Sequence, residues 1–232
     1  MASETPEVGP SKVRTRRTCV RMTLAWVVTP LFFLVTGGSL GWWEAWVYCV
    51  LLLVPMTLFV ARMARTDPEF LERRFARKEK ERTQRRVNLW SVPLLLALYV
   101  VPGLDRRFGW SEPPLAAVVA AQALTLASYL GVLGVFVTNR WAGRTVETRP
   151  GQEVVSTGPY ALVRHPMYSA SILLYLASPV ALGSWWAVIP AVLYVPVLVV
   201  RILNEEQVLV RELPGYEEYR EKVRYRLLPF VW

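Results

Sequence analysis

The sequence predicts an all-α fold: a polytopic membrane helical bundle of about six membrane segments, ending in a C-terminal helical hairpin and a cytoplasmic amphipathic segment. Three observations support this. Of the 232 residues, 53% are hydrophobic, and the mean hydropathy is +0.29. Most charges fall in four stretches that are separated by long apolar runs. This pattern is typical of a polytopic membrane protein rather than of a soluble domain with one core.

Four apolar runs come first, and each is predicted as a span, since about 20 apolar residues cross a bilayer as a helix. They lie at about residues 20–40, 42–61, 89–104 and 113–138. The next run, residues 169–203, is too long for one span. Ser178-Pro179 and residues 183–186 interrupt it, which predicts a tight helical hairpin with short arms.

These runs divide the chain into three regions. Residues 1–19 are expected to form a basic, flexible N-terminal tail without a cleavable signal peptide. Residues 20–138 hold four transmembrane helices with a basic loop at 62–88. Residues 139–232 are the expected catalytic, cofactor-binding module. With six spans, the four charged stretches share one membrane face, so we predict a multi-pass protein with both termini cytoplasmic.

The net charge of +9 does not indicate a nucleic-acid partner. In a membrane protein, basic loops record orientation and attraction to anionic lipids, so membrane lipids are the expected partners. Cys19 and Cys49 do not have the spacing of a metal site, and no metal is predicted. The oligomeric state is not predicted.

The chain's only histidine lies in the segment Arg164-His165-Pro166-Met167-Tyr168. Proline is tolerated at the first position of a helix, so His165 is expected at the helix cap. Arg164 would then lie beside the positive end of the helix dipole, a field that favours anionic groups. A basic cap that holds a membrane helix at the lipid surface fits these residues equally well.

A second group of charges follows the hairpin. Arg201 and Glu205 are four residues apart and share a helix face, whereas Glu206 points about 100° away from Glu205. The hairpin returns Glu205 to the membrane face of His165, so a ligand with a carboxylate and a cationic centre would match both. The alternative is an Arg–Glu pair whose long side chains reach the membrane surface.

The last part of the chain has one apolar-aromatic helical face. Tyr216, Tyr219 and Val223 follow helical spacing, so they can pack together on one side. Two interpretations stay open, namely an amphipathic anchor in the membrane interface and a lid over a cofactor.

Taken together, these motifs resemble the isoprenylcysteine carboxyl methyltransferase family. The series is Gly158-Pro159-Tyr160, the segment 164–168, Glu205-Glu206, Gly215-Tyr216-Glu217-Glu218-Tyr219 and Arg226-Leu227-Leu228-Pro229. Membrane phospholipid N-methyltransferases share the Glu-Glu part. The resemblance covers about residues 152–232 and implies a helical membrane enzyme that binds S-adenosylmethionine on the cytosolic side.

The resemblance also implies roles for individual residues. The expected cofactor contacts are Gln152, Glu153, Val154, Val155, Tyr160, His165, Pro166, Met167, Tyr168 and Glu205. Residues 152–155 alternate in polarity, which by itself predicts an extended segment. Arg201 is expected to be catalytic by binding and positioning a substrate carboxylate, which is ionised at neutral pH and needs no base. An amine acceptor must lose a proton, and Glu206 or His165 is then a candidate base.

Two features depart from the family pattern. Ala170 stands where the pattern usually has glycine, and its methyl group is expected to crowd a close helix contact. Nothing in the first four predicted spans identifies a prenyl-binding tunnel. The expected acceptor is therefore described only as a lipophilic small molecule, a lipid or a prenylated protein, with a carboxylate favoured.

Three alternative functions remain. The first is a phospholipid or other lipid N-methyltransferase. The second is an NADPH-dependent membrane reductase of the sterol-reductase type, because those enzymes carry a similar Arg-His-Pro-x-Tyr segment. The third is a non-enzymatic membrane protein. Charges inside the predicted spans are nearly absent, with Glu44 as the exception near a span end, so no intramembrane ion path is predicted.

Overall fold

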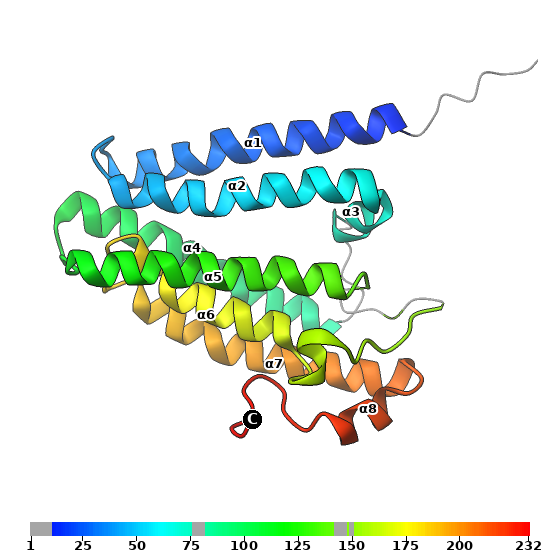
Figure 1. Ribbon diagram of the computed structural model, residues 1–232. Helices are drawn as coiled ribbons and strands as arrows, with labels where there is room; N and C mark the ends of the chain where they lie inside the picture. The colour runs from blue at the N-terminus through cyan, green and yellow to red at the C-terminus, as the bar shows by residue number, and fades with distance from the viewer. Residues whose placement is uncertain (1–10, 76–81, 142–147, 149–150) are drawn as a thin grey trace, which may run out of the picture.

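The computed structural model describes residues 11–75, 82–141, 148 and 151–232. In these residues the secondary structure is helical throughout, without a strand. The elements are α1 (Ser11–Gly37), α2 (Trp43–Thr66), α3 (Pro68–Phe75), α4 (Arg82–Phe108), α5 (Leu115–Thr138), the 3-10 turn η1 (Gly158–Ala161), α6 (Pro166–Ala181), α7 (Val188–Glu212) and α8 (Tyr216–Lys222). Figure 1 shows the long helices lying side by side as one bundle.

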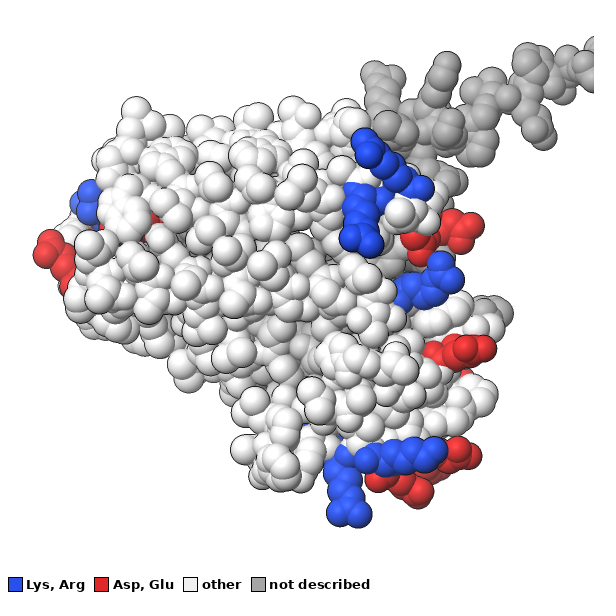
Figure 2. Space-filling view, in the orientation of Figure 1, with Lys and Arg blue, Asp and Glu red and all other residues white. Residues whose placement is uncertain are grey.

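The bundle has the dimensions of a membrane protein. Among the described residues, five helices are long and apolar enough to cross a bilayer, namely α1, α2, α4, α5 and α7. Figure 2 shows the charged side chains gathered at the two ends, with an uncharged belt between them. The predicted polytopic helical bundle is therefore confirmed. The sixth apolar helix, α6, has 16 residues and a length of roughly 24 Å, which is short of a full span.

Helices extend well beyond the predicted spans. Helix α1 begins at Ser11, so residues 11–19, which we expected to be a flexible tail, are helical. Much of the predicted loop 62–88 is also helical, because α2 continues to Thr66 and α3 follows it. Hydropathy marks where a helix meets lipid, whereas Arg and Lys are good helix formers and do not end a helix.

Helix α3 packs on the bundle although its sequence is highly charged. Its start is capped by Asp67, whose Oδ1 accepts a hydrogen bond from the Phe70 amide at 3.0 Å. Phe70 and Leu71 are buried in a cluster with residues of α2 and α5. The connection between α2 and α4 therefore contributes to the interior of the protein.

Helices α5 and α6 approach closely, and Ala170 lies in this contact. A Cβ added to Gly131 of α5 would lie 3.5 Å from the Ala170 Cβ, which is ordinary van der Waals contact. The Ala170 methyl therefore fits against a glycine on the facing helix, and the expected crowding is absent at this contact. Small residues at such contacts allow membrane helices to pack closely.

At one end of the bundle, which we call the far end, a buried carboxylate ties the loops together. Asp105 at the end of α4 accepts hydrogen bonds from the Ser111 amide at 2.7 Å and the Ser111 hydroxyl at 2.6 Å. It also accepts one from the hydroxyl of Ser184, in the turn between α6 and α7. The indole of Trp42, before α2, donates to the Leu182 carbonyl of the same turn at 3.0 Å. The hairpin is thus fixed at its closed end.

Candidate functional site

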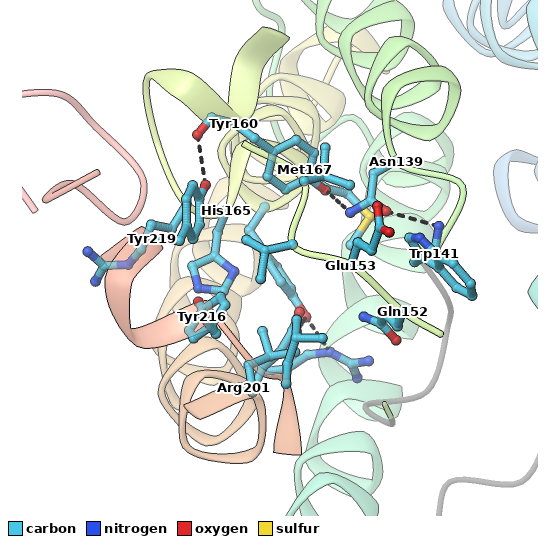
Figure 3. Close-up of a pocket in the computed structure, with 17 residues that line it drawn as sticks. Asn139, Trp141, Gln152, Glu153, Tyr160, His165, Met167, Arg201, Tyr216 and Tyr219 are labelled. Atoms are coloured by element: carbon cyan, nitrogen blue, oxygen red, sulfur yellow. Dashed lines mark hydrogen bonds between the residues drawn. The ribbon is translucent and has the colours of Figure 1, made fainter. Parts of the chain in front are cut away.

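A cavity with polar and apolar walls lies at the opposite end of the bundle, which we call the site end. The loop after α5, the start of α6, the last turns of α7 and the segment containing α8 surround it. Figure 3 shows side chains from these segments pointing into one space. We call this the polar cavity.

Most of the predicted cofactor residues meet here. Gln152, Glu153, Val154, Val155, Tyr160, His165, Met167, Tyr168 and Glu205 all line the polar cavity, as does Arg201. Pro166 does not line it, because it occupies the first turn of α6 and is buried. Residues 152–155 are non-helical, as expected for an extended segment. No sequence pattern pointed to Asn139, Trp141, Leu209 or Leu213, which complete the wall together with Arg164, Tyr216 and Tyr219.

The start of α6 lies where the sequence predicts it. Pro166 is the first helical residue, and His165 is the capping residue. The His165 amide donates to the Arg226 carbonyl at 2.9 Å, and the Arg164 amide donates to the Tyr225 carbonyl at 2.9 Å. The C-terminal segment therefore holds the entry to α6 in place.

Glu206 binds basic side chains and does not itself line the polar cavity. It is 4% exposed, and its Oε1 accepts a bond of 2.7 Å from Arg164 Nε. Its Oε2 accepts a bond of 2.8 Å from Arg226 Nε, and His165 Nε2 lies 3.2 Å from Oε1. Arg164 Nη1 also donates to the carbonyls of Val223 and Arg224.

This arrangement changes the interpretation of two residues. Glu206 was a candidate base, but it is absent from the wall of the polar cavity, and a base must reach the proton that it removes. Arg164 was placed as an attraction for anions, but its guanidinium is bound to Glu206. Both residues attach the C-terminal segment to the bundle in this structure.

Tyr168 forms hydrogen bonds with both Glu205, which was predicted to contact the cofactor, and Arg201, which was predicted to bind a substrate carboxylate. Its hydroxyl donates to Glu205 Oε2 at 2.6 Å and accepts a bond from Arg201 Nε at 2.9 Å. Arg201 Nη1 in turn donates to Asn88 Oδ1 of α4 at 2.8 Å. A line of hydrogen bonds therefore runs from α4 across α6 to Glu205 of α7.

A second cavity of about 560 Å³ lies within the bundle, beside the first. We call it the apolar cavity, because side chains such as Met56, Phe59, Leu95, Val132 and Leu198 dominate its wall. All of α1 to α7 contribute to it. Met167, Tyr168 and Arg201 line both cavities. The first four helices thus enclose an apolar space that no local sequence pattern had identified.

The C-terminal aromatic face covers the polar cavity. Leu213, Tyr216, Tyr219 and Val223 form a buried cluster, against which Val154 and Leu209 pack. The Tyr219 hydroxyl donates to the Tyr160 carbonyl at 2.7 Å. Of the two interpretations of this face, its position favours the lid, and we call residues 213–223 the lid.

Two tyrosine hydroxyls in this wall stay protonated at neutral pH. Burial raises the pKa of Tyr160 to about 12, although the hydrogen bond from Asn139 opposes the shift. Burial, followed by the nearby charges of Glu206 and Glu205, raises the pKa of Tyr216. The Tyr216 hydroxyl is buried and has no hydrogen-bond partner among the described residues. A buried unpaired hydroxyl in a cavity wall is suited to bind a ligand.

Comparisons with known proteins point to the same part of the chain. Residues 115–214, which run from α5 to the end of α7, match the sequence model of the phospholipid methyltransferase family. The chain is 26% identical over 145 residues to the nickel-cobalt-cadmium resistance protein NccN of Alcaligenes xylosoxydans xylosoxydans. That match covers 60% of this chain and 63% of the relative.

A second relative is Delta(14)-sterol reductase TM7SF2 of Mus musculus, 31% identical over 91 residues. That match covers 38% of this chain and 22% of the reductase. The chain thus spans less than two thirds of either relative. Residues 115–214 are thus similar to the phospholipid methyltransferase family, which includes the isoprenylcysteine carboxyl methyltransferases, and the predicted resemblance is confirmed over that part of the chain.

Proposed function

We propose that this protein is an integral membrane methyltransferase that uses S-adenosylmethionine to methylate the carboxylate of a lipophilic acceptor. The observation that carries this proposal is the shared wall of the two cavities. Met167, Tyr168 and Arg201 separate a polar space at the bundle end from an apolar space within the bundle. A water-soluble donor and a lipid-soluble acceptor can therefore meet at one place.

The wall of the polar cavity suits a cofactor that carries both ammonium and carboxylate groups. The Glu205 carboxylate faces the cavity and would bind the ammonium group. Tyr216 offers a protonated hydroxyl without a partner, and Met167 with Val154 and Val155 offers apolar contact. The enclosed space of about 110 Å³ is smaller than the roughly 300–1,000 Å³ of small-molecule sites. Binding would therefore require the lid to move outward.

The apolar cavity suits the tail of an acceptor. Its volume of about 560 Å³ lies within the usual range for small-molecule sites, which supports an acceptor with one lipid chain. Arg201 at its boundary would form a charge-assisted hydrogen bond with the acceptor carboxylate. Asn88 and Tyr168, which now bind Arg201, would hold the guanidinium in position.

The proposed reaction requires alignment of the two reactants rather than acid–base catalysis by these residues. When bound, S-adenosylmethionine supplies an electrophilic methyl group on a sulfonium. The carboxylate oxygen of an acceptor held by Arg201 would attack that carbon in line, and a C–O bond would form as the C–S bond breaks, with a neutral thioether as the leaving group. No proton moves, so a base is not required. Arg201 and the wall around it would align the acceptor and exclude water, and orientation can supply roughly 7–11 kcal/mol.

The position of Glu206 supports a carboxylate over an amine acceptor. Phospholipid N-methylation needs a group to receive a proton from the amine. Glu206, one of the two candidates for that role, binds Arg164 and Arg226 instead. The other candidate, His165, lines the polar cavity, and its Nε2 lies 3.2 Å from the Glu206 carboxylate. Most of the basic side chains lie at the site end (Figure 2), which supports the predicted orientation with the site end and both termini in the cytoplasm.

The direct test is methyl transfer from tritium-labelled S-adenosylmethionine in native membranes. We expect label in a lipophilic fraction that base releases, as for a methyl ester. Arg201→Ala should abolish this transfer while calorimetry still measures cofactor binding. Full activity of Arg201→Ala, or label that base does not release, would indicate a different acceptor.

The similarity to a sterol reductase gives the second candidate function, an NADPH-dependent reductase. Calorimetry with S-adenosylmethionine and with NADPH separates the two. His165→Ala and Glu205→Ala should both weaken binding of S-adenosylmethionine. Unchanged binding in both variants would contradict the assignment of the polar cavity and leave a non-enzymatic role.

A further inference from the structure

The chain after the lid ends in an apolar turn that faces outward. Residues 227–232 read Leu-Leu-Pro-Phe-Val-Trp and carry no charged side chain. Phe230 is 88% exposed, Val231 75% and Leu228 53%. We call residues 228–231 the apolar tip. Exposure of three neighbouring large apolar side chains to water is unfavourable, so another surface is needed to cover them.

The backbone of the apolar tip is held in one conformation. The Trp232 carbonyl accepts hydrogen bonds from the amides of Arg226 at 2.8 Å and Leu227 at 3.0 Å. Phe230 has φ of 66°, in the left-handed region that a bulky residue rarely adopts. Such strain persists only where the surrounding structure fixes it. The turn thus presents the Phe230 ring outward, with the Tyr225 ring centroid 5.2 Å from it.

The apolar tip lies beside the membrane-spanning part of the bundle. Leu227, which precedes it, is buried in one cluster with Tyr194 and Leu198 of α7, and Trp232 packs against this cluster. The Ser169 hydroxyl in the first turn of α6 donates to the Leu227 carbonyl at 2.7 Å. Figure 1 shows the C-terminal segment turning back from α8 along the bundle. The tip therefore continues the lipid-facing surface.

Basic side chains precede the apolar tip. Lys222 and Arg224 are exposed, and Figure 2 shows basic side chains, with acidic ones next to them, beside an uncharged surface at this corner. Apolar side chains next to Lys and Arg are the combination by which segments bind the interface of an anionic bilayer. We propose that the apolar tip inserts into the bilayer leaflet at the site end, with Lys222 and Arg224 among the lipid headgroups.

Insertion of the apolar tip would hold the lid over the polar cavity. Arg226, next to the tip, binds Glu206, and its amide and that of Leu227 bind the same carbonyl. The membrane anchor predicted for the C-terminal segment is thus assigned to residues 228–231, because Tyr216 and Tyr219 line the polar cavity instead and Val223 is buried with them. The proposal does not depend on the reaction that the protein performs.

The test uses an environment-sensitive fluorophore, NBD, on the full chain in nanodiscs of phosphatidylcholine and phosphatidylglycerol. Cys19→Ser removes the exposed thiol, while Cys49 is buried. Val231→Cys carries the probe, so that Phe230 stays in place, and Phe230→Cys serves as a second position. Glu221→Cys, on the exposed side of α8, is the matched control. Lipids with a nitroxide at a shallow acyl position act as quenchers.

We expect blue-shifted emission at positions 231 and 230 and several-fold stronger lipid quenching than at position 221. Equal, water-like emission and equal quenching at the three positions would overturn the proposal. Blue-shifted emission without lipid quenching would also overturn it, because a second copy or another protein would then cover the tip. Nanodiscs that each hold a single copy of the protein would then distinguish a second copy from another protein as the cover.

Discussion

Glu206 and Arg164 form an ion pair of 2.7 Å between two side chains that are each less than 10% exposed. The same carboxylate binds Arg226 at 2.8 Å. The pair therefore joins the start of α6 to α7 and, through Arg226, to the segment that follows the lid. Because this ion pair is buried, a substitution at Glu206 tests whether the pair holds the lid in place.

Glu206→Gln should destabilise the protein strongly. Removal of one partner of a buried ion pair leaves an uncompensated charge and costs about 3–5 kcal/mol. We expect a lower midpoint of thermal unfolding in nanodiscs. The control is Glu217→Gln, whose carboxylate is exposed and 3.5 Å from Arg220; surface pairs contribute about 0–1 kcal/mol. Similar midpoints for the two variants would contradict the role of Glu206.

Tyr216→Phe should weaken cofactor binding without loss of stability. The hydroxyl that it removes has no partner among the described residues, and deletion of an unsatisfied buried group is neutral or stabilising. A hydrogen bond to the ligand is worth about 0.5–1.5 kcal/mol, so calorimetry should show an affinity loss of about 2- to 10-fold. Tyr219→Phe, which removes a bond to the Tyr160 carbonyl, should instead lower the unfolding midpoint. Lost stability in Tyr216→Phe together with lost cofactor affinity in Tyr219→Phe would exchange the roles of the two tyrosines.

Tyr168→Phe should slow methyl transfer by about 10- to 100-fold in kcat/KM, because hydrogen bonds to charged groups are worth about 1.5–3 kcal/mol. Without its hydroxyl, Arg201 and Glu205 lose their common partner. Kinetics with an S-farnesylcysteine derivative or palmitate as single-chain carboxylate probes would measure this. Tyr225→Phe, outside both cavities, is the control. Equal rates in the two variants would remove Tyr168 from the mechanism.

Val132→Phe should raise KM for the lipophilic acceptor without changing the affinity for the cofactor. Val132 lines the apolar cavity only, and added bulk in such a pocket discriminates by about tenfold or more. Val119→Phe on the same helix is the control, because Val119 is 51% exposed to the surrounding lipid. A change in cofactor affinity instead of acceptor KM would show that the two cavities do not hold separate ligands.

Stability should fall in alkaline solution, in part through Tyr160. Burial raises the pKa of its hydroxyl to about 12, against about 10 in an unfolded chain. Between these values the unfolded state releases a proton that the folded state keeps, so the free energy of unfolding decreases as pH rises. Thermal unfolding at pH 9, 10 and 11 should show a steeper decline for the wild type than for Tyr160→Phe. Parallel declines would exclude this contribution.

The sequence predicts the parts of the site that are local in the chain. The helix start at Pro166 follows from the geometry of proline, and the hairpin follows from the break at residues 183–186. Ser178-Pro179, which was also predicted to interrupt the run, lies inside α6, which continues to Ala181. The non-helical segment 152–155 and the helical spacing of Tyr216 and Tyr219 are likewise local patterns. Each of these depends on neighbours within a few residues, which a single sequence displays.

The missed features depend on partners that are distant in the chain. Arg201 binds Asn88, 113 residues away, and Arg164 binds Glu206, 42 residues away. A sequence shows which side chains are charged but not which charges will neutralise one another. The apolar cavity was missed for a related reason, because many helices each contribute only a few residues. Helix α3 was missed because its charged composition conceals two buried residues, Phe70 and Leu71.

The hydrogen bonds of the Asp105 carboxylate are expected to affect how the protein responds to bilayer thickness. Because it ties two loops together at the far end, helices that tilt must separate mainly at the site end. Bilayers of different thickness change helix tilt. We therefore expect turnover to depend on lipid chain length, and Asp105→Asn, which loosens the far end, to weaken that dependence.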